Sequence, residues 1–579
     1  MDAKKHGTHS RLPSRPGTAA RSLHHGNTKH GNHSSAAPRT AVALAVGVMA
    51  VLLLAAVLFG ARWTPSGDAH TWVSAGVRAV LNAGSSEQGA GSPLATVPDP
   101  GDRLLGGLLS PDFDDDGSCL SRYRAALYRR PSLHALSPHL VAALRRYEAL
   151  HRLCGPGTTA YARAVEHRRS AAAPPNASAA PYYSGCRYVV WTPNAGLGNR
   201  ILSITSAFLY VLLTDRVLLL HGGGGDPGDL FCEPFPGTTW VLPREDFPAA
   251  RERLSADAAA SLGNTLRRGE APGGAAWLYV HLLHDYRAND RRFFCDDVQG
   301  ELRRVPWLVL QADNYFAPGL FLLRRHERAL ARMFPRRDAV FHHLGRYLFH
   351  PSNAVWGMVT RYHDAYFAGA AAGERVGVQV RKFKWAPIST DELYRQILSC
   401  AHRENILPDV GAGVPTRAAN ASTGGQPAKR KAVVFVSLYS DYSNRLREAY
   451  EKHGAAGGET VTVFQPTHLG VQRFGDRQQD QKALAEMVLL SFSDVAVTTA
   501  VSTFGYVSTG LAGMRPWVLM GPDHGKAPGT PCRLATTVEP CFHTPPNYDC
   551  RAKARGDTGS MVPYIRHCED FPQGVHLVE

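Results

Sequence analysis

An uncharged apolar run near the N-terminus divides this chain into a short leader and a long body. The run reads "AVALAVGVMAVLLLAAVLFGA" from Ala41 to Ala61 and is long enough to span a bilayer as a helix. Residues 1–40 contain seven lysines and arginines, whereas Asp2 is their single acidic residue. The positive-inside rule therefore predicts a basic cytosolic tail, a single-pass membrane anchor at 41–61 and a lumenal body. The alternative, a cleaved signal sequence, usually has a shorter apolar core and a shorter leader.

The cysteines agree with a lumenal body. All ten follow the apolar run, from Cys119 to Cys568, and none forms a Cys-x-x-Cys pair. An oxidising compartment favours disulfides, although their pairing cannot be read from the sequence. Asn176 and Asn420 stand in Asn-x-Ser glycosylation sequences in the same part of the chain, whereas the predicted topology places the matching Asn32 in the cytosol.

Residues 62–184 are predicted to form a stem and linker with one helical segment. The first part, to about Asp102, is rich in Gly, Ser, Ala and Pro, which is typical of a flexible stem. The stretch "SPHLVAALRRYEALHRLC" is amphipathic, with Ser137 as helix cap and Pro138 in the first turn. A Pro- and Ala-rich linker at 168–181 precedes the body.

From residue 185 on, short strand-like runs alternate with helical stretches. An apolar strand signal at 188–191 is followed by a glycine loop, a helix over 200–213 and a strand over 216–220. A second series begins with the strand-like "RVGVQVR" at 375–381. Such alternation predicts parallel sheets that are covered by helices on both faces.

We therefore expect an α/β fold with two Rossmann-like lobes. The N-terminal lobe is placed at 185–365 and the C-terminal lobe at 366–579. The Gly-, Ala- and Thr-rich stretch 409–431 interrupts the second lobe and is predicted to be a surface insertion. In open α/β sheets, ligands bind in the crevice at the carboxyl ends of the strands.

One such strand end carries the sequence "NAGLGNR". Gly196 and Gly198 permit turns that a Cβ atom would block, and the backbone N–H groups at the following helix start favour anions. The loop lacks the third glycine of a dinucleotide fingerprint, and it is not a Walker P-loop. A tight turn with a capping Asn199 is an equally simple interpretation of this stretch by itself.

Two further strand ends carry polar residues. Arg381 ends the strand "GVQVR", and an arginine fork suits pyrophosphate, although a structural salt bridge is the alternative. Ser502 and Thr503 lie at a strand-to-helix turn, where they either cap the helix or also bind phosphate. Three polar turns of this kind in one chain favour a crevice for a nucleotide diphosphate.

The net charge and the motifs of the sequence exclude several classes of function. The formal net charge of +15 indicates an anionic partner such as phosphate, nucleotide or membrane surface, although part of the excess lies in the tail. Nucleic acid is not expected, because no basic-aromatic module is present.

The acidic run at 112–116 follows no strand and is interpreted as solvated surface, so no metal is expected. Gly-x-Ser-x-Gly and His-Glu-x-x-His are absent, which disfavours the corresponding hydrolases.

From Gly185 to Cys550 the chain resembles the plant fucosyltransferases of glycosyltransferase family 37, whose best-known activity is xyloglucan fucosylation. The tail, the stem and the insertion are not covered by the resemblance. The motifs that carry it stand in order along the body: "GLGNRILSITSAFLYVLLTDRVLLL", "LFCEPFPGTTWVLP", "YVHLLHDYRANDRRFFCDD", "ADNYF", "HHLGRYLFHPSNAVWGMVTRY", "GVQVR", "KALAEMVLLSFSDVAVTTAVSTFGYV" and "EPCFHTPPNYDC".

The resemblance implies a GT-B-like enzyme that needs no metal or other cofactor. It implies GDP-β-L-fucose as donor and an α-1,2-linked fucoside, made with inversion on a galactose residue of a cell-wall glycan. Enzymes of this family are single-pass type II proteins of the Golgi membrane, which agrees with the topology predicted above. The implied partners are GDP-fucose, a polysaccharide or glycoprotein glycan acceptor and the membrane. The oligomeric state is left open, with a homodimer as one option.

The resemblance also implies roles for particular residues. Asn199 and Arg200 match the family's Gly-Asn-Arg turn and are expected near the donor sugar and diphosphate. Arg381 matches the arginine of the first nucleotide-sugar motif and is expected to stabilise the leaving GDP. Asp313 of "ADNYF" is the candidate base, directly or through a water, with a structural carboxylate as the alternative. The family's C-terminal nucleotide-sugar motif is matched by Ser502, Thr503, Phe504, Gly505 and Tyr506.

Two rival interpretations remain at this stage. One keeps the donor chemistry and changes the acceptor from xyloglucan to arabinogalactan-protein glycans. The other is a catalytically inactive homologue that binds glycan, against which the complete set of motif residues argues. The run His221–Asp229 and the insertion at 409–431 depart from the family pattern, and they are expected to affect acceptor contacts more than donor binding.

Overall fold

The computed structural model describes residues 102–113, 117–171, 185–223, 225–368, 373–411 and 429–579. The predicted tail and anchor, residues 62–101 of the stem, and both lumenal glycosylation sequences lie outside these residues. The same holds for all but the ends of the predicted insertion, whose last two residues, Arg430 and Lys431, begin a strand of the second sheet. Those predictions therefore stay predictions.

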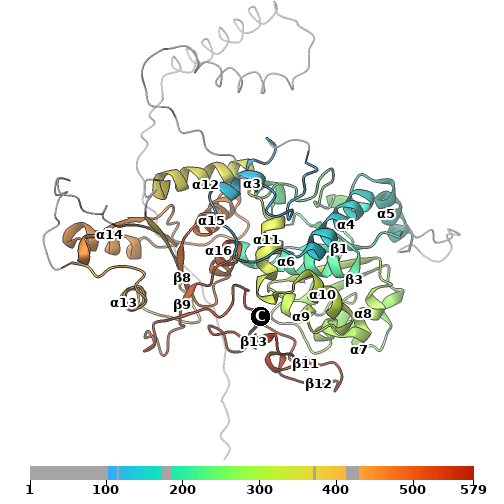
Figure 1. The fold of residues 1–579 in the computed structure, drawn as a ribbon. Coiled ribbons are helices and arrows are strands. Elements are labelled where there is room, and N and C mark those ends of the chain that lie inside the picture. Colours follow the sequence, from blue (N-terminus) through green and yellow to red (C-terminus); the bar gives the residue numbers. More distant parts are fainter. Residues whose placement is uncertain (1–101, 114–116, 172–184, 224, 369–372, 412–428) are drawn as a thin grey trace, which may run out of the picture. The chain divides into compact units, whose positions relative to one another are not determined.

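A four-stranded parallel sheet forms the first lobe (Figure 1, cyan to green). Nearly every residue of its strands is buried, because helices and loops cover both faces, and this explains their almost continuous apolar sequences. The strands lie in the order β2-β1-β4-β3, with the bounds Tyr188–Thr192 (β1), Val217–Leu220 (β2), Trp277–Leu282 (β3) and Trp307–Ala312 (β4).

A six-stranded sheet forms the second lobe (Figure 1, yellow to red). Its strands are parallel except for the antiparallel edge strand β10, which the sequence pattern did not predict. The order is β10-β9-β8-β5-β6-β7, with the bounds Glu374–Val380 (β5), Arg430–Ser437 (β6), Thr460–Phe464 (β7), Val495–Thr499 (β8), Trp517–Leu519 (β9) and Cys532–Leu534 (β10).

Helices connect the strands of both sheets, as the alternating pattern predicted. Ser389 caps α13 by accepting a hydrogen bond from the N–H of Glu392, and Ser137 caps α4 in the same way from His139. The principal helices are Pro138–Cys154 (α4), Thr159–Ala171 (α5), Leu197–Thr214 (α6), Val340–Leu348 (α11), Asn353–Tyr366 (α12), Thr390–Arg403 (α13), Asp441–His453 (α14), Arg477–Leu490 (α15) and Thr503–Ala512 (α16). Shorter helices are Leu120–Arg124 (α3), Leu262–Arg267 (α7), Asp296–Leu302 (α8), Ala317–Leu320 (α9) and Glu327–Met333 (α10).

Five helices pack together where the two lobes meet. Helix α6 of the first lobe packs against α11, α15 and α16, and α12 packs along α15 (Figure 1). Within the described residues α6 is the one helix long and apolar enough to cross a membrane, but 83% of that stretch is buried inside the protein. It is therefore a core helix, and its burial between the lobes fixes the position of the glycine loop that begins it.

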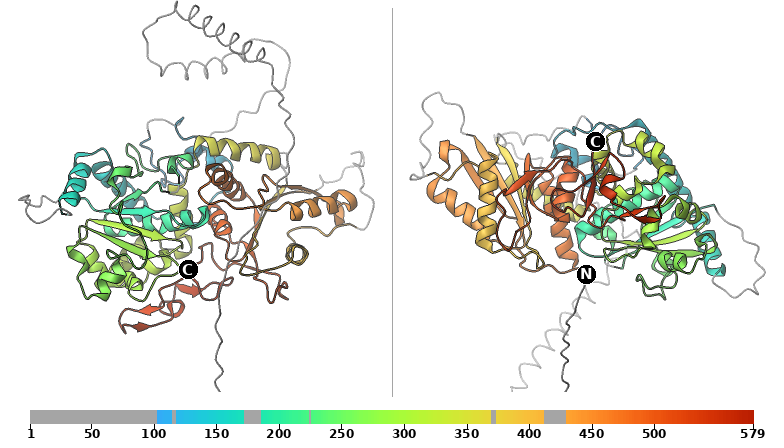
Figure 2. Two further views of the ribbon diagram at one scale, coloured as in Figure 1. Left: turned by 180° about the vertical axis from the view of Figure 1, so that it is seen from behind. Right: turned by 90° about the horizontal axis from the view of Figure 1, so that it is seen from below.

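The end of the chain returns to the first lobe. Phe542, Ile565 and Val575 share one apolar core with the first sheet, and β14 (Val575–Leu577), which pairs with β13 (Ile565–His567), contacts α9 (Figure 2, red against green). A disulfide between Cys295 and Cys550 ties this C-terminal segment to the first lobe. The boundaries predicted at 185, 365 and 366 did not anticipate this return.

All ten cysteines are paired in the structure. The five disulfides join Cys119 to Cys232, Cys154 to Cys186, Cys295 to Cys550, Cys400 to Cys532 and Cys541 to Cys568. Helix α4, predicted as an amphipathic helical segment of the stem, buries Leu140, Leu144 and Tyr147 in the core of the first lobe. The prediction of two α/β lobes is confirmed, and the sheets are parallel as predicted except at β10.

Candidate functional site

The carboxyl ends of the two sheets face one cleft with a volume of about 360 Å³. Its walls come from the glycine loop before α6, the loop after β5, the β7–α15 loop and the start of α16. A volume of this size is typical of a small-ligand site. The three polar turns found in the sequence, although more than 300 residues apart at the extremes, therefore meet at one place.

Asn199 connects two of these turns across the lobes. Its Nδ2 donates to the backbone carbonyl of Asp313 at 2.8 Å, and its Oδ1 accepts from Oγ1 of Thr503 at 3.0 Å. Gly198, one residue earlier, lies so close to α16 that an added Cβ would be 2.9 Å from the carbonyl carbon of Thr503. The capping role proposed as an alternative for Asn199 is thus replaced by a bridge between helices α6 and α16.

This close approach predicts that Gly198→Ala weakens both folding and transfer. An alanine gains up to about 1 kcal/mol of helix propensity over glycine, but forcing the backbone of Thr503 away costs about 1–3 kcal/mol. We therefore expect a lower Tm and a loss of turnover in the folded fraction. Gly274→Ala is the matched control, because no atom lies within 4 Å of its added Cβ. Equal behaviour of the two variants in thermal unfolding would contradict the expectation.

Arg381 follows β5 and projects into the cleft. Its N–H donates to Oγ1 of Thr499 at 3.0 Å, and its Nη2 donates to Oε1 of Gln472 at 2.7 Å. Burial lowers the pKa of the guanidinium, and no carboxylate pairs with it among the described residues. The salt bridge considered for Arg381 from the sequence is therefore not present in that part of the chain. A partly buried positive charge without a counter-ion is suited to an anionic ligand.

The motif from Ser502 to Tyr506 divides into two groups. Ser502, Thr503 and Phe504 line the cleft at the start of α16, and the Ser502 hydroxyl makes no capping hydrogen bond. Gly505 packs against β8, where an added Cβ would be 2.9 Å from Cβ of Thr498. Tyr506 lies behind the cleft wall, with its hydroxyl 2.5 Å from Oδ2 of Asp570. The last two residues thus support the cleft rather than line it.

Asp313 lies at the end of β4, buried behind the cleft wall. Its carboxylate accepts hydrogen bonds from Nδ1 of His284 at 2.6 Å and from the side-chain amide of Asn314. The hydrogen bond to Asp313 raises the pKa of His284, whose side chain is 74% exposed. The carboxylate is thus held by two neighbours. Asp313 contacts the cleft residue Asn199 through its backbone carbonyl.

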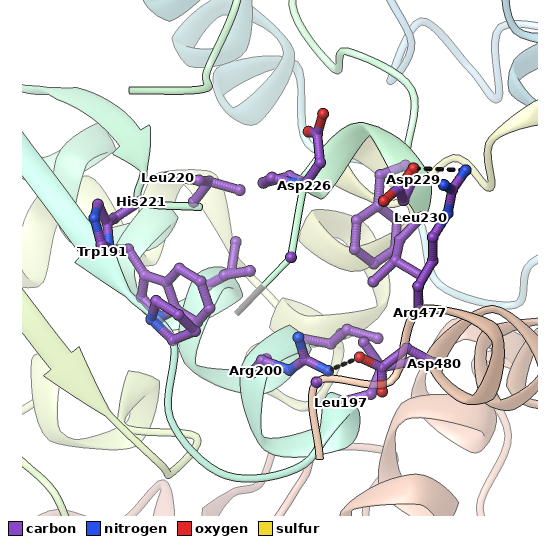
Figure 3. A pocket seen from close by; sticks show the side chains of 17 residues that line it. Trp191, Leu197, Arg200, Leu220, His221, Asp226, Asp229, Leu230, Arg477 and Asp480 are labelled. Carbon is purple, nitrogen blue, oxygen red and sulfur yellow. Dashed lines mark hydrogen bonds and ion pairs between the residues drawn. The ribbon is translucent and has the colours of Figure 1, made fainter. Parts of the chain in front are cut away.

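Arg200 does not line this cleft, although its partner Asp480 does. It forms an ion pair with Asp480 of α15, and both side chains are about nine-tenths buried (Figure 3). The pair borders a smaller, mostly apolar pocket of about 50 Å³, whose rim carries a second ion pair, between Arg477 and Asp229 at 2.9 Å (Figure 3). Both ion pairs join the first lobe to α15, so Arg200 is placed to hold the lobes together.

Sequence reasoning missed several residues of the cleft. The β7–α15 loop contributes Gln472, Arg473 and Phe474, and the segment after Cys541 contributes His543. Lys482 adds a third cation to Arg381 and Arg473, while burial raises the pKa of Glu486 to about 8, which keeps this carboxyl group neutral at pH 7. Asp480 also lines the cleft, but Arg200 pairs with its charge, so the cleft is electropositive. The loop has no periodicity that could have shown its position, whereas His543 stands inside a motif that carried the family resemblance.

Two Rossmann-like lobes enclose an electropositive cleft, with an arginine at a strand end and a helix N-terminus beside it, and this arrangement fits a GT-B-like glycosyltransferase that uses a nucleotide sugar. Comparison with known proteins makes the assignment specific. The sequence profile of the xyloglucan fucosyltransferase family matches residues 78–551, and the chain belongs to that family. The predicted membership and enzyme class are thereby confirmed.

Individual relatives match over most of the body. A galactoside 2-alpha-L-fucosyltransferase of Arabidopsis thaliana is 45% identical over 484 residues, which is 82% of this chain and 83% of that protein. The enzyme of the same name from Pisum sativum is 44% identical over 83% of this chain and 82% of its own length. A solved structure of a mutant of Arabidopsis thaliana FUT1 in complex with GDP superposes with a TM-score of 0.74 at 43% identity, covering 82% of this chain and 100% of that one.

Proposed function

We propose that this protein transfers L-fucose from GDP-β-L-fucose to a galactose residue of a plant cell-wall glycan, forming an α-1,2 linkage with inversion. The names of the curated relatives and the GDP in the related solved structure support this substrate pair. The observation that carries the proposal is the partly buried charge of Arg381, which faces the cleft without a carboxylate partner among the described residues. Xyloglucan is the proposed acceptor, and arabinogalactan-protein glycan is the alternative.

The cleft offers separate places for the parts of the donor. The diphosphate lies between Arg381 and the N-terminus of α16, where the hydroxyl of Ser502 and the backbone N–H groups are available. A neighbouring pocket of about 130 Å³ shares Arg381 with the cleft and continues over Ile388 and Leu519. Its largely apolar walls suit a purine base, which leaves the fucose in the part of the cleft nearest to Asn199.

The proposed chemistry needs stabilisation of the leaving GDP and a path for the acceptor proton. Arg381 and the amides at the start of α16 stabilise the negative charge that develops on the diphosphate. Asp313 acts from behind the wall, because its carboxylate orients His284 and its carbonyl orients Asn199. The acceptor proton reaches this carboxylate through a water molecule or through His284 rather than by direct contact.

A donor and acceptor screen with the fragment from Asp102 to the C-terminus tests the proposal. Fucose should be transferred from GDP-fucose to galactose-containing xyloglucan oligosaccharides, and not from UDP-galactose or GDP-mannose. Product linkage by NMR should show an α-1,2 fucoside. Transfer to arabinogalactan glycans alone would favour the alternative acceptor. A fragment that is folded by circular dichroism but transfers no fucose to either acceptor would overturn the proposal.

We predict that transfer survives metal chelation. Among the described residues the one grouping of three potential ligands is Cys541, Cys568 and Asp570, and its two cysteines form a disulfide. The positive charges of Arg381, Arg473 and Lys482 replace the charge that a divalent ion would supply. Turnover with EDTA should equal turnover without it. Complete loss in EDTA that Mn²⁺ or Mg²⁺ restores would instead require a metal-dependent mechanism.

We further propose that the protein is a type II protein of the Golgi membrane with its body in the lumen. The basic leader before Ala41 and the five disulfides support this topology, since disulfides form in oxidising compartments. In sealed vesicles the body should resist added protease, and glycosidase treatment should lower its mass at Asn176 or Asn420. Digestion of the body in intact vesicles would rule the topology out.

A further inference from the structure

His543 lines the cleft, and a chain of hydrogen bonds connects it to a carboxylate behind the wall. Its Nε2 lies 3.2 Å from the hydroxyl oxygen of Tyr506, which in turn lies 2.5 Å from Oδ2 of Asp570. The same Oδ2 accepts from the N–H of Val501 at 2.8 Å. The chain of contacts therefore runs from the protein interior to the cleft.

The direction of these hydrogen bonds is fixed by chemistry. A carboxylate oxygen accepts, so the single hydroxyl hydrogen of Tyr506 goes to Asp570. The phenol oxygen then has only lone pairs to offer, and His543 must donate from Nε2. A neutral imidazole that carries its hydrogen on Nε2 has a lone pair on Nδ1. Burial lowers the pKa of His543, against the opposing charges of Asp570 and Asp313, which favours the neutral ring.

Nδ1 of His543 is free to bind a ligand. This nitrogen has no hydrogen-bond partner among the described residues. It is also not among the fully buried polar atoms, so a ligand can reach it. The next residue is tied to the first lobe, because Tyr286 donates to the carbonyl of Thr544 at 2.8 Å. His543 therefore belongs to the side of the cleft where the lobes meet.

We infer that His543 is a substrate-binding residue whose Nδ1 accepts a hydrogen bond from a sugar hydroxyl, and that Tyr506 and Asp570 are positioning residues that hold its tautomer. The inference rests on the proposed function, because it takes the ligand of the cleft to be a sugar. The hydroxyl belongs either to the fucosyl group of the donor or to the acceptor glycan, and both offer the same O–H donor to Nδ1.

Three substitutions of His543 separate binding from a structural role. Asparagine keeps an acceptor near the position of Nδ1 but does not reach Tyr506, whereas glutamine keeps a donor near the position of Nε2 and loses the acceptor. We expect His543→Ala and His543→Gln to lower kcat/KM by about 10- to 100-fold, and His543→Asn to lose less than either, since an unpaired substrate hydroxyl costs about 1–3 kcal/mol. A glutamine variant near the wild-type rate, with an asparagine variant as slow as alanine, would make His543 a structural tie to Tyr506 and overturn the inference.

The double variant tests whether Tyr506 acts through His543. Tyr506→Phe should slow the wild-type enzyme but add little to His543→Asn, which has already lost the contact between the two side chains. If the rate losses of Tyr506→Phe and His543→Asn add fully in the double variant, Tyr506 does not act by positioning His543. Thermal unfolding of each variant checks that the differences do not follow the folded fraction.

Two assays on the same preparations identify the hydroxyl. A loss in both fucose transfer and acceptor-free GDP-fucose hydrolysis assigns it to the fucosyl group, and a loss in transfer alone assigns it to the acceptor. The wild-type enzyme is measured first, so that absence of any GDP-fucose turnover marks failure of the proposed function, and the inference would fall with it. If the wild type is active and the three His543 variants all have the same rate, the inference is refuted while the proposed function stands.

Discussion

Arg381→Ala should lose fucose transfer by about 100- to 1000-fold while the protein stays folded. The guanidinium projects into the cleft, bonded to Gln472 and without a carboxylate partner among the described residues, so its removal breaks no ion pair there. Loss of one preorganised donor to a leaving diphosphate costs about 2.7–4 kcal/mol, by analogy with an oxyanion hole. Steady-state turnover of GDP-fucose and thermal unfolding, measured on one preparation, separate catalysis from stability.

Two further variants sharpen this result. Arg381→Lys should recover only part of the rate, because lysine keeps the charge but not the planar fork that bonds two phosphate oxygens. Arg395→Ala is the matched control, since Arg395 is an exposed arginine of the same lobe that pairs with Glu392. Near-normal turnover by folded Arg381→Ala protein would remove Arg381 from the site and weaken the proposed placement of the donor.

The sequence predicted best those features that depend on neighbouring residues. The strand, glycine loop and helix around Gly198 were predictable, because a short continuous apolar run, typical of a buried strand, is followed there by a glycine turn and a longer helical run. Arg381 was predictable as a cleft residue, because the carboxyl ends of parallel strands share one edge of the sheet. The edge strand β10 was not predictable, since three residues carry too little pattern to show their direction.

Contacts between distant segments lay beyond sequence reasoning. The Cys295–Cys550 disulfide spans 255 residues, and no spacing rule connects such partners. The return of the C-terminal segment to the first lobe brings His543 into the cleft, although the helices and strands around it belong to other parts of the chain. Family motifs included His543 without showing what its ring contacts.

Arg200 illustrates how sequence adjacency misleads. Asn199 and Arg200 stand side by side in the motif, so one role near the donor was expected for both. On a helix, successive side chains diverge by about 100°, and residues i and i+1 do not face the same neighbour. Asn199 therefore contacts Thr503 of α16 directly. Arg200 instead faces Asp480 on α15 (Figure 3).

This placement predicts that Arg200→Ala destabilises the protein more than it impairs donor binding. Removing the arginine leaves the buried Asp480 without its counter-ion, a change that typically costs about 3–5 kcal/mol. We expect a lower Tm with an almost unchanged KM for GDP-fucose in the remaining folded enzyme. Arg477→Ala is the control, because its ion pair with Asp229 also joins the lobes but Arg477 is 67% exposed, and such pairs contribute about 0–1 kcal/mol.

A double substitution decides between a structural and a donor-binding Arg200. Replacing both partners by apolar residues of similar size, Arg200→Met with Asp480→Leu, removes the uncompensated charge and should restore stability to within about 1 kcal/mol of the wild type. If Arg200 only holds the lobes together, transfer returns with stability, because the mostly apolar surroundings of the pair accept both side chains. If Arg200 instead contacts the diphosphate, the double variant is stable yet slow, with a raised KM for GDP-fucose, and the structural assignment of Arg200 is wrong.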